Sequence, residues 1–205
     1  MLGHESMRVC VAVSGRGSNL EALLHALADD APARVALVVS NRPAAGGLDV
    51  ARRHGVPTAV LTDAADADEW LGLLERARID LVVLAGYLKL VPPAVVARYR
   101  GRIINIHPGL LPAFGGPGMY GIRVHEAVLA AGARESGATV HLVDEAYDRG
   151  AALAEVRVPV QRGDTPDSLA ARVLAAEHRL LPAVVLAAAR AGHAVPLREP
   201  VELSS

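Results

Sequence analysis

Two patterns of hydrophobic and polar positions alternate along this chain. Short apolar runs bounded by turn residues are typical of buried strands, whereas apolar residues three or four positions apart, such as Leu20, Leu23, Leu24 and Leu27, are typical of helices. Strands are predicted at residues 8–13, 35–39, 57–61, 80–86, 103–107, 139–143 and 155–160. Helices are predicted at 20–27, 48–54, 69–77, 92–99, 124–131 and 165–191, the last interrupted at Pro182.

The order of these elements predicts the fold class. Strands that alternate with helices form a mostly parallel, twisted sheet flanked by helices on both faces, which is a Rossmann-like α/β fold. We expect residues 1–205 to form a single domain, with residues 1–7 as a loose leader. Such sheets bind ligands beyond the carboxyl ends of their strands. Ser14, Gly86, His107 and Val143 close predicted strands, so all of them would share this edge if the strands are parallel.

Composition and charge exclude several classes of protein. Of the 205 residues, 52% are hydrophobic and only 3% aromatic, which predicts an aliphatic core. A net charge of −1 argues against nucleic acid as a partner. The single cysteine, Cys10, lies in a predicted strand, so we expect no disulfide framework, and no residue cluster has the spacing of metal ligands. We expect a cytoplasmic protein with no membrane partner, because no signal peptide or membrane-length apolar run is present.

Residues 105–112, Asn-Ile-His-Pro-Gly-Leu-Leu-Pro, carry the most informative motif. Strand alternation places Asn105 and His107 on the same side of the chain, and Pro108 ends the strand. An amide and an imidazole together could stabilise a carbonyl oxygen that becomes negative during attack on an acyl group. Alternatively, the two side chains only anchor the loop that follows. These residues alone leave both interpretations open.

Residues 14–20, Ser-Gly-Arg-Gly-Ser-Asn-Leu, join the first predicted strand to the first helix. Glycines there allow a tight turn, and the start of the helix can bind an anion through its N–H groups. The loop is neither a Walker motif nor a full dinucleotide fingerprint, so a single phosphate fits best. The alternative is an ordinary turn in which Ser18 or Asn19 caps the helix.

These two motifs together carry a resemblance to a known family. With shorter matches at residues 39–42, 83–87, 140–143, 147–150 and 177–178, the chain resembles the phosphoribosylglycinamide formyltransferases, folate-dependent enzymes of purine synthesis. The likeness extends from residue 8 to about residue 196. Each short match is weak, but the ordered set is specific.

The resemblance implies an enzyme that transfers a formyl group from 10-formyltetrahydrofolate to the amine of phosphoribosylglycinamide, without a metal. It implies that the catalytic residues are Asn105, His107 and Asp148, supported by Thr139 and His141. It assigns the substrate phosphate and ribose to Arg16, Gly17, Ser18, Asn19 and Glu177. It assigns the folate to Leu88, Lys89, Leu90, Val91, Asn105, Asp144, Glu145, Ala146, Tyr147 and Asp148.

This chemistry needs no covalent intermediate, because an amine is already a nucleophile. We expect protonated His107 and the Asn105 amide to stabilise the oxyanion. Asp148 would raise the pKa of His107 and organise a water that relays the proton. Without the resemblance, Asp148 is better interpreted as a turn residue and His141 as a hydrogen-bonded core residue. His125 begins a predicted helix, where it would cap, pack or lie at the rim of the site.

The chain departs from the family's commonest pattern in three places, and other functions stay open. Gly109 stands where serine is frequent, residues 114–121 are longer than usual, and the helix near residues 66–70 begins with acidic residues. The alternatives are a formyltetrahydrofolate hydrolase, which normally carries an extra N-terminal domain, and a non-catalytic folate- or nucleotide-binding module. A homodimer also stays open.

Overall fold

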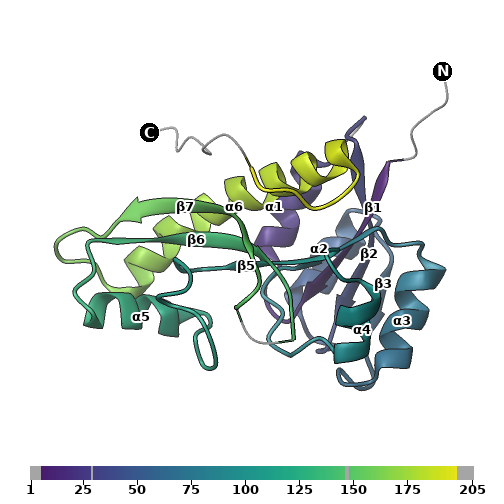
Figure 1. Ribbon diagram of the computed structural model, residues 1–205, viewed down its shortest axis with the longest axis horizontal. Coiled ribbons are helices and arrows are strands. Elements are labelled where there is room, and N and C mark those ends of the chain that lie inside the picture. The colour runs from purple at the N-terminus through teal and green to yellow at the C-terminus, as the bar shows by residue number, and fades with distance from the viewer. Residues whose placement is uncertain (1–5, 29, 146–147, 198–205) are drawn as a thin grey trace.

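A seven-stranded sheet forms the centre of the computed structural model, which describes residues 6–28, 30–145 and 148–197 (Figure 1). The strands are β1 (Met7–Val13), β2 (Ala33–Ser40), β3 (Thr58–Val60), β4 (Leu81–Leu84), β5 (Ile103–His107), β6 (Glu135–Leu142) and β7 (Ala152–Pro159). The helices are α1 (Ser18–Ala26), α2 (Gly46–Arg53), α3 (Ala67–Arg76), α4 (Pro93–Arg98), α5 (Ile122–Ala130) and α6 (Pro166–Ala191). The strand order is β3-β2-β1-β4-β5-β6-β7, which confirms the predicted fold class.

The five strands from β3 to β5 are parallel, and all of them except the short β3 contribute buried apolar side chains to both faces of the sheet. In β1, Val9 and Val11 pack into the core on one face, whereas Cys10 and Ala12 pack into the core on the other. This double burial explains why these strands are continuous apolar runs in the sequence. In contrast, β7 alternates between buried and exposed residues because only one of its faces is covered.

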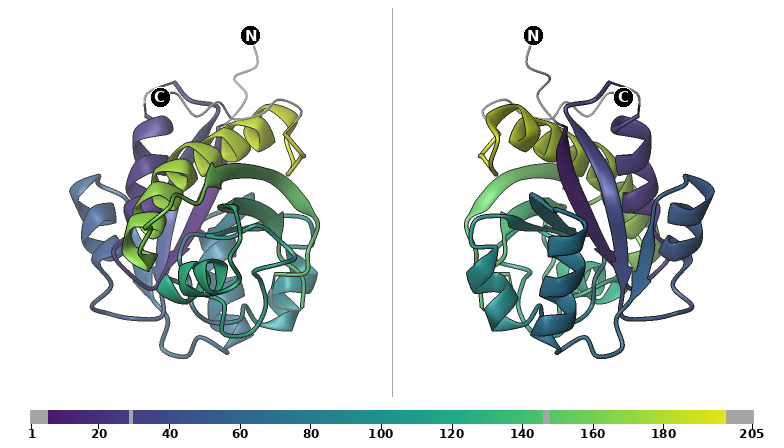
Figure 2. Two further views of the ribbon diagram at one scale, coloured as in Figure 1. Left: turned by 90° about the vertical axis from the view of Figure 1, so that its left-hand side faces the viewer. Right: turned by 90° about the vertical axis from the view of Figure 1, so that its right-hand side faces the viewer.

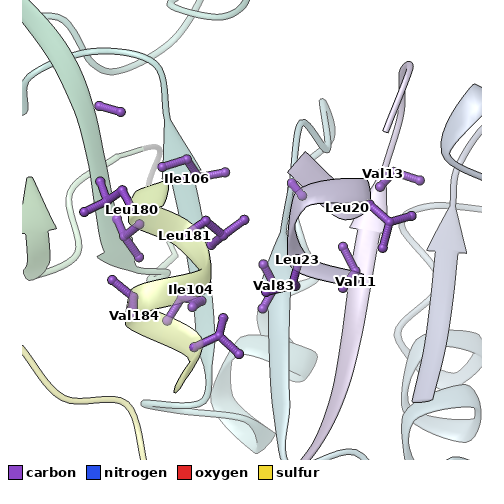
Figure 3. Close-up of a cluster of buried hydrophobic side chains, with 14 of the residues drawn as sticks. Val11, Val13, Leu20, Leu23, Val83, Ile104, Ile106, Leu180, Leu181 and Val184 are labelled. Carbon is purple, nitrogen blue, oxygen red and sulfur yellow. The ribbon is translucent and has the colours of Figure 1, made fainter. Parts of the chain in front are cut away.

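Helices cover both faces of the parallel strands. Helices α1 and α6 lie side by side on one face, while α3 and α4 pack together on the other (Figures 1 and 2). Leu20 and Leu23 of α1 belong to the same buried cluster as Val83 of β4. In Figure 3, Leu23 lies beside Val83, and Leu181 of α6 lies near Ile104 of β5. All five side chains are fully buried.

The prediction that Val143 closes a strand at the same edge as His107 is wrong. Strand β6 runs antiparallel to β5, so its end lies beside the start of β5, where the Val143 N–H donates to the Ile103 carbonyl at 2.9 Å. The same pairing sets Asn105 opposite His141 and His107 opposite Thr139. Val143 therefore lies beside the start of β5 rather than beside its end. The antiparallel pairing also places two polar pairs, Asn105–His141 and His107–Thr139, on adjacent strands.

The predicted interruption at Pro182 is also wrong, because α6 continues through this residue. A proline inside a helix costs about 3 kcal/mol. Around it, Leu180, Leu181, Val184 and Val185 are all 0% exposed, and burial of each such side chain contributes about 1.5–3 kcal/mol. Burial of this face therefore outweighs the cost of the proline. At the other end of the chain, Met7 belongs to β1 rather than to a loose leader.

The chain reverses its direction of travel across the sheet between β1 and β4. From β1 it moves outward to β2 and β3, and then it returns to place β4 on the other side of β1. The loops that follow β1 and β4 therefore diverge, and ligands of open α/β sheets bind at such a switch point. Among the described residues, no helix is both long and apolar enough to cross a membrane.

Candidate active site

A cavity of about 790 Å³ opens at the carboxyl ends of β1, β4 and β5. It therefore lies at the switch point that the topology predicts. Four segments that follow or precede regular elements form most of its wall: residues 15–19, 84–91, 105–108 and 116–122. The rest of the wall is formed by His125, His141, Val143, Asp144, Asp148, Asp167, Ala170, Leu174 and Glu177.

One end of the cavity is the loop that leads into α1. Gly17 is the N-cap residue of this helix and has a φ of 86°, in the left-handed region that favours glycine. A Cβ atom at Gly17 would lie 2.5 Å from the Gly47 Cα atom, so the loop packs against the start of α2. No side chain caps α1, which argues against Ser18 or Asn19 as an ordinary helix cap. The start of α1 lines the cavity beside the exposed Arg16, and the first N–H groups of a helix have no partner within the helix.

The close approach at Gly17 gives a testable prediction. Gly17→Ala should lower the free energy of unfolding by more than about 2 kcal/mol, because the left-handed backbone and the collision with Gly47 both add strain. Gly55→Ala is the matched control: Gly55 has a φ of 68°, but no atom lies within 4 Å of its would-be Cβ atom. The control should lose only about 1 kcal/mol in urea unfolding. Equal losses in the two variants would contradict the tight packing of this loop.

The other side of the cavity holds the motif side chains. Strand pairing brings the Asn105 Nδ2 atom within 3.0 Å of His141 Nε2. The His141 Nδ1–H donates to the Leu142 carbonyl at 2.8 Å, so in a neutral ring Nε2 accepts the Asn105 N–H. Likewise, the His107 Nε2–H donates to the Phe114 carbonyl at 2.6 Å. Both imidazoles are therefore oriented by backbone carbonyls.

Asp148 lies between the two histidines. Its Oδ2 atom is 3.6 Å from His107 Nδ1, and its Oδ1 atom is 3.4 Å from His141 Nε2. The Gly116 N–H donates to Oδ2 at 2.9 Å, and Asp148 itself has a φ of 54°, which is unusual for a residue other than glycine. In neutral rings the two nitrogens that face Asp148 carry no proton. The carboxylate is therefore placed to stabilise a proton that arrives on either imidazole.

Burial and charge act in opposite directions on these groups. Burial lowers the pKa of His107 below its ordinary value, although Asp148 and the Phe114 carbonyl act to raise it. Asp148 therefore acts on the pKa of His107 in the predicted direction, but burial is the larger effect and sets the net direction. For Asp148, burial acts to raise the pKa, but the adjacent His141, the hydrogen bond from the Gly116 N–H and the nearby His107 lower it overall. At neutral pH the free site thus holds a neutral His107 beside an ionised Asp148.

Thr139, which pairs with His107 across β5 and β6, bonds to the turn that follows His107. It is 1% exposed, its Oγ1–H donates to the Gly109 carbonyl at 2.8 Å, and the Leu111 N–H donates to Oγ1 at 3.3 Å. These bonds hold the turn that follows His107. A Cβ atom at Gly109 would lie 3.1 Å from His107 Nε2 and 2.9 Å from Val124, so glycine leaves room there for the imidazole.

Glu177 of α6 lines the cavity beside the start of α1. Its carboxyl is 6% exposed and accepts a hydrogen bond from Asn19 Nδ2 at 2.6 Å. Burial raises the pKa of Glu177 from 4.5 to about 7, even though the bond from Asn19 lowers it. The carboxyl is therefore partly protonated at neutral pH, so it can both donate and accept a hydrogen bond in the cavity.

This raised pKa predicts an unusual dependence of stability on pH. The folded chain holds the Glu177 proton more tightly than the unfolded chain, so the free energy of unfolding falls as the pH rises from 4.5 to about 7. Glu177→Gln keeps an acceptor for Asn19 without this penalty. It should be more stable than the wild type by about 3 kcal/mol near pH 8 and by less than about 1 kcal/mol near pH 5. Urea unfolding at both values measures the difference, and a pH-independent difference would contradict the assignment.

The segments assigned to folate reach the cavity only in part. Leu88, Lys89, Leu90 and Val91 all line it, as does Asp144. Glu145 is exposed and does not contribute to the wall, and Ala146 and Tyr147 lie outside the described residues. Of the longer segment 114–121, residues 116–121 line the cavity.

Two groups in the site were not predicted in these roles. The Phe114 carbonyl, which orients His107, has no signal in the side-chain sequence. Of the three expectations for His125, packing is confirmed: it does not cap α5, it is 3% exposed, and it lines the cavity. Its Nδ1 atom lacks a hydrogen-bond partner among the residues that the structure describes. Burial and the charge of His107 lower the pKa of His125. Its position one turn into α5, after a glycine-rich loop, was the only hint in the sequence.

The structure is an α/β protein whose cavity at the switch point of the sheet gathers the start of α1 and a cluster of polar and titratable side chains. A family model described as formyl transferase matches residues 7–185. The chain belongs to this formyl transferase family. Among the residues that the structure describes, no group of three or more His, Cys, Asp or Glu side chains is arranged to hold a metal ion.

Similar proteins agree with this family. The chloroplastic phosphoribosylglycinamide formyltransferase of Arabidopsis thaliana is 45% identical over 192 residues, which cover 89% of this chain and 66% of that protein. The phosphoribosylglycinamide formyltransferase of Haemophilus influenzae is 35% identical over 185 residues, or 87% of this chain and 85% of that protein. The chain therefore spans slightly less than two thirds of the plant relative, but most of the bacterial one.

Solved structures show the same fold. The crystal structure of phosphoribosylglycinamide formyltransferase from Anaplasma phagocytophilum has a TM-score of 0.84 and 39% identity, and the match covers 91% of this chain and 89% of that one. A formyltetrahydrofolate deformylase from Pseudomonas syringae has a TM-score of 0.81 at 26% identity, covering 91% of this chain but 62% of that one.

Proposed function

We propose that this chain transfers a formyl group from 10-formyltetrahydrofolate to the amine of phosphoribosylglycinamide, in purine biosynthesis. One observation carries the proposal. A single cavity joins the uncapped start of α1 at Gly17–Asn19 to the cluster of Asn105, His107, His141 and Asp148. Phosphoribosylglycinamide would place its phosphate at the start of α1, and 10-formyltetrahydrofolate would place its formyl carbon at the side-chain cluster. The family and its similar proteins support the same reaction.

The proposed binding roles follow the two ends of the cavity. Arg16, Gly17, Ser18 and Asn19 would hold the phosphate, where the positive end of α1 favours an anion. Glu177 would bind the ribose hydroxyls, because its partly protonated carboxyl can both donate and accept. The folate would lie along residues 88–91 and Asp144. The resemblance assigns Ala146 and Tyr147 to the folate as well.

The proposed mechanism begins with attack of the substrate amine on the formyl carbon. As the new C–N bond forms, the carbonyl electron pair moves onto oxygen, and the Asn105 amide donates a hydrogen bond to this oxyanion. The attacking nitrogen becomes positive and loses a proton to neutral His107, which Asp148 then stabilises as an imidazolium. The charged imidazole also stabilises the oxyanion. The carbonyl re-forms as the bond to the folate nitrogen breaks, and that nitrogen takes the proton through a water held by Asp148.

An assay of the purified protein tests the proposal. 10-Formyltetrahydrofolate is mixed with the protein, with and without phosphoribosylglycinamide, and the folate absorbance is followed. We expect tetrahydrofolate to form only when the amine is present. Folate binding without turnover under both conditions would instead indicate a non-catalytic binding module and would refute the proposal.

A second candidate is hydrolysis of the same folate, with water in place of the amine. The similarity to the deformylase structure favours this candidate, because it shows that the fold also occurs in an enzyme named for that reaction. The same assay separates the two functions. Equal rates with and without phosphoribosylglycinamide would identify the hydrolase.

The proposal places the reaction in the cytoplasm. Cys10 is 0% exposed, and burial raises the pKa of its thiol, so it is an inert core residue with no partner cysteine in the sequence. This usage fits a reducing compartment. Fractionation of cells that express the tagged protein would test the location.

A further inference from the structure

Ser14, the residue that follows β1, joins the ends of three neighbouring strands. It is 2% exposed. Its hydroxyl donates to Asn41 Oδ1 at 2.6 Å and accepts from the Leu88 N–H at 2.9 Å, while its own N–H donates to the Gly86 carbonyl at 3.0 Å. Asn41 follows β2, and Leu88 lies in the loop after β4. Because the strand order is β2-β1-β4, one buried side chain connects β1 with both of its neighbours.

Elementary chemistry determines which atom donates and which accepts in each hydrogen bond to the Ser14 hydroxyl. A backbone N–H can only donate, so the Ser14 hydroxyl must be the acceptor for Leu88. The hydroxyl has a single proton, which is then available for Asn41 Oδ1. The relay Leu88–Ser14–Asn41 therefore uses the hydroxyl once as donor and once as acceptor, and loss of the hydroxyl leaves an N–H without a protein acceptor.

The loop that Ser14 holds has little packing of its own. Leu88 is 42% exposed and Leu90 is 50% exposed, although both line the cavity. Buried side chains anchor this loop only at its ends, at Tyr87 and Val91. The position of the Leu88 backbone therefore depends on the hydrogen bond to Ser14 more than on hydrophobic contacts.

We propose that Ser14 is a positioning residue for the formyl donor: through Leu88 it sets the backbone of residues 88–91 against the anion-binding loop. This inference rests on the proposed function for the identity of the donor. Ser14 therefore acts on binding of the folate rather than on the reacting atoms. A change at Ser14 should then separate the two substrates kinetically.

The anion-binding loop is held by other bonds. The Gly47 N–H donates to the Gly15 carbonyl at 3.0 Å, and the Glu21 N–H donates to the Gly17 carbonyl at 2.9 Å. These bonds and the bond from the Ser14 N–H to Gly86 use backbone atoms only. Ser14→Ala leaves all of them in place, so binding of the phosphate-bearing substrate should change little.

The test compares Ser14→Ala with Ser136→Ala. Ser136 is also a buried serine of the sheet, 0% exposed, but its hydroxyl has no hydrogen-bond partner among the described residues. Loss of the buried hydrogen bond to the Leu88 N–H predicts that Ser14→Ala raises the KM for 10-formyltetrahydrofolate by about tenfold, with kcat and the KM for phosphoribosylglycinamide within about twofold of wild type. Ser136→Ala should match wild type in all three. A donor KM raised by less than about threefold, or an equal rise in both KM values, would overturn the proposal.

Three further measurements keep the inference testable if Ser14→Ala folds poorly or if the wild type shows no turnover. Asn41→Ala removes the far end of the relay and should raise the donor KM selectively, by a smaller factor than Ser14→Ala. Hydrogen exchange of the Leu88 amide should be faster in Ser14→Ala than in Ser136→Ala, and the Kd for tetrahydrofolate should be higher. A wild type that neither binds folate nor turns it over would refute the proposed function, whereas unchanged exchange at Leu88 would refute the role of Ser14.

Discussion

His107→Ala is expected to lower kcat by about 10²–10³-fold while the KM values for both substrates stay within about threefold of wild type. The imidazole accepts the proton of the attacking amine and, once charged, stabilises the oxyanion. Both roles arise only as the transition state forms, so the loss should appear in kcat rather than in substrate binding. Steady-state kinetics with each substrate varied in turn measures this separation.

A matched histidine controls for the substitution itself. His193→Ala removes an exposed imidazole after α6 and should leave kcat unchanged. Thermal unfolding of His107→Ala establishes that the variant is folded, because His107 is buried and bonded to the Phe114 carbonyl. A folded His107→Ala variant with kcat within about threefold of wild type would show that the imidazole takes no part in the reaction.

Asp148→Asn should lower kcat by about 10²–10⁴-fold, because general acid–base assistance is lost when the imidazolium has no anion to stabilise it. Asparagine keeps the shape of the side chain and an oxygen for the Gly116 N–H, so the loop should stay in place. The charge of Asp148 acts to raise the pKa of His107 against the effect of burial. We therefore also expect the pKa of His107 to fall further below its ordinary value in the variant, as followed by NMR titration.

The pKa measurement distinguishes an electrostatic role from a structural one. A loop that only lost its shape would reduce turnover without a directed shift of the His107 pKa. Asp49→Asn, an exposed carboxyl on α2, is the control and should change neither quantity. An Asp148→Asn variant with a normal rate, or with an unchanged His107 pKa, would remove Asp148 from the mechanism.

The sequence predicted those elements whose signals are local. Strand β5 has the predicted bounds 103–107 because an apolar run with alternating polar positions ends at a proline. The antiparallel direction of β6 could not be predicted, since nothing within residues 135–142 encodes which neighbour the strand pairs with. The continuity of α6 through Pro182 also depends on the surrounding core, whose burial outweighs the local cost.

The residues of the site also differ in whether the local sequence predicts them. Strand alternation was enough to place Asn105 and His107 on one side of the chain, whereas Asp148 required the resemblance, because a turn aspartate carries no signal of its own. The net pKa of His107 follows from three-dimensional burial, which competes with the charge that sequence reasoning considered. The roles of the Phe114 carbonyl and of His125 depend on how residues 108–125 fold over the cavity, so neither could be predicted from residue type.

Direct transfer between two molecules bound in one cavity is most directly tested by a single-turnover experiment with 10-formyltetrahydrofolate labelled in its formyl group. With phosphoribosylglycinamide present, we expect all of the transferred label on that substrate's amine, and without it neither labelled protein nor labelled formate should accumulate. Label on the protein before the amine is added would reveal a covalent intermediate, and label released as formate would reveal hydrolysis. Either result would contradict direct transfer.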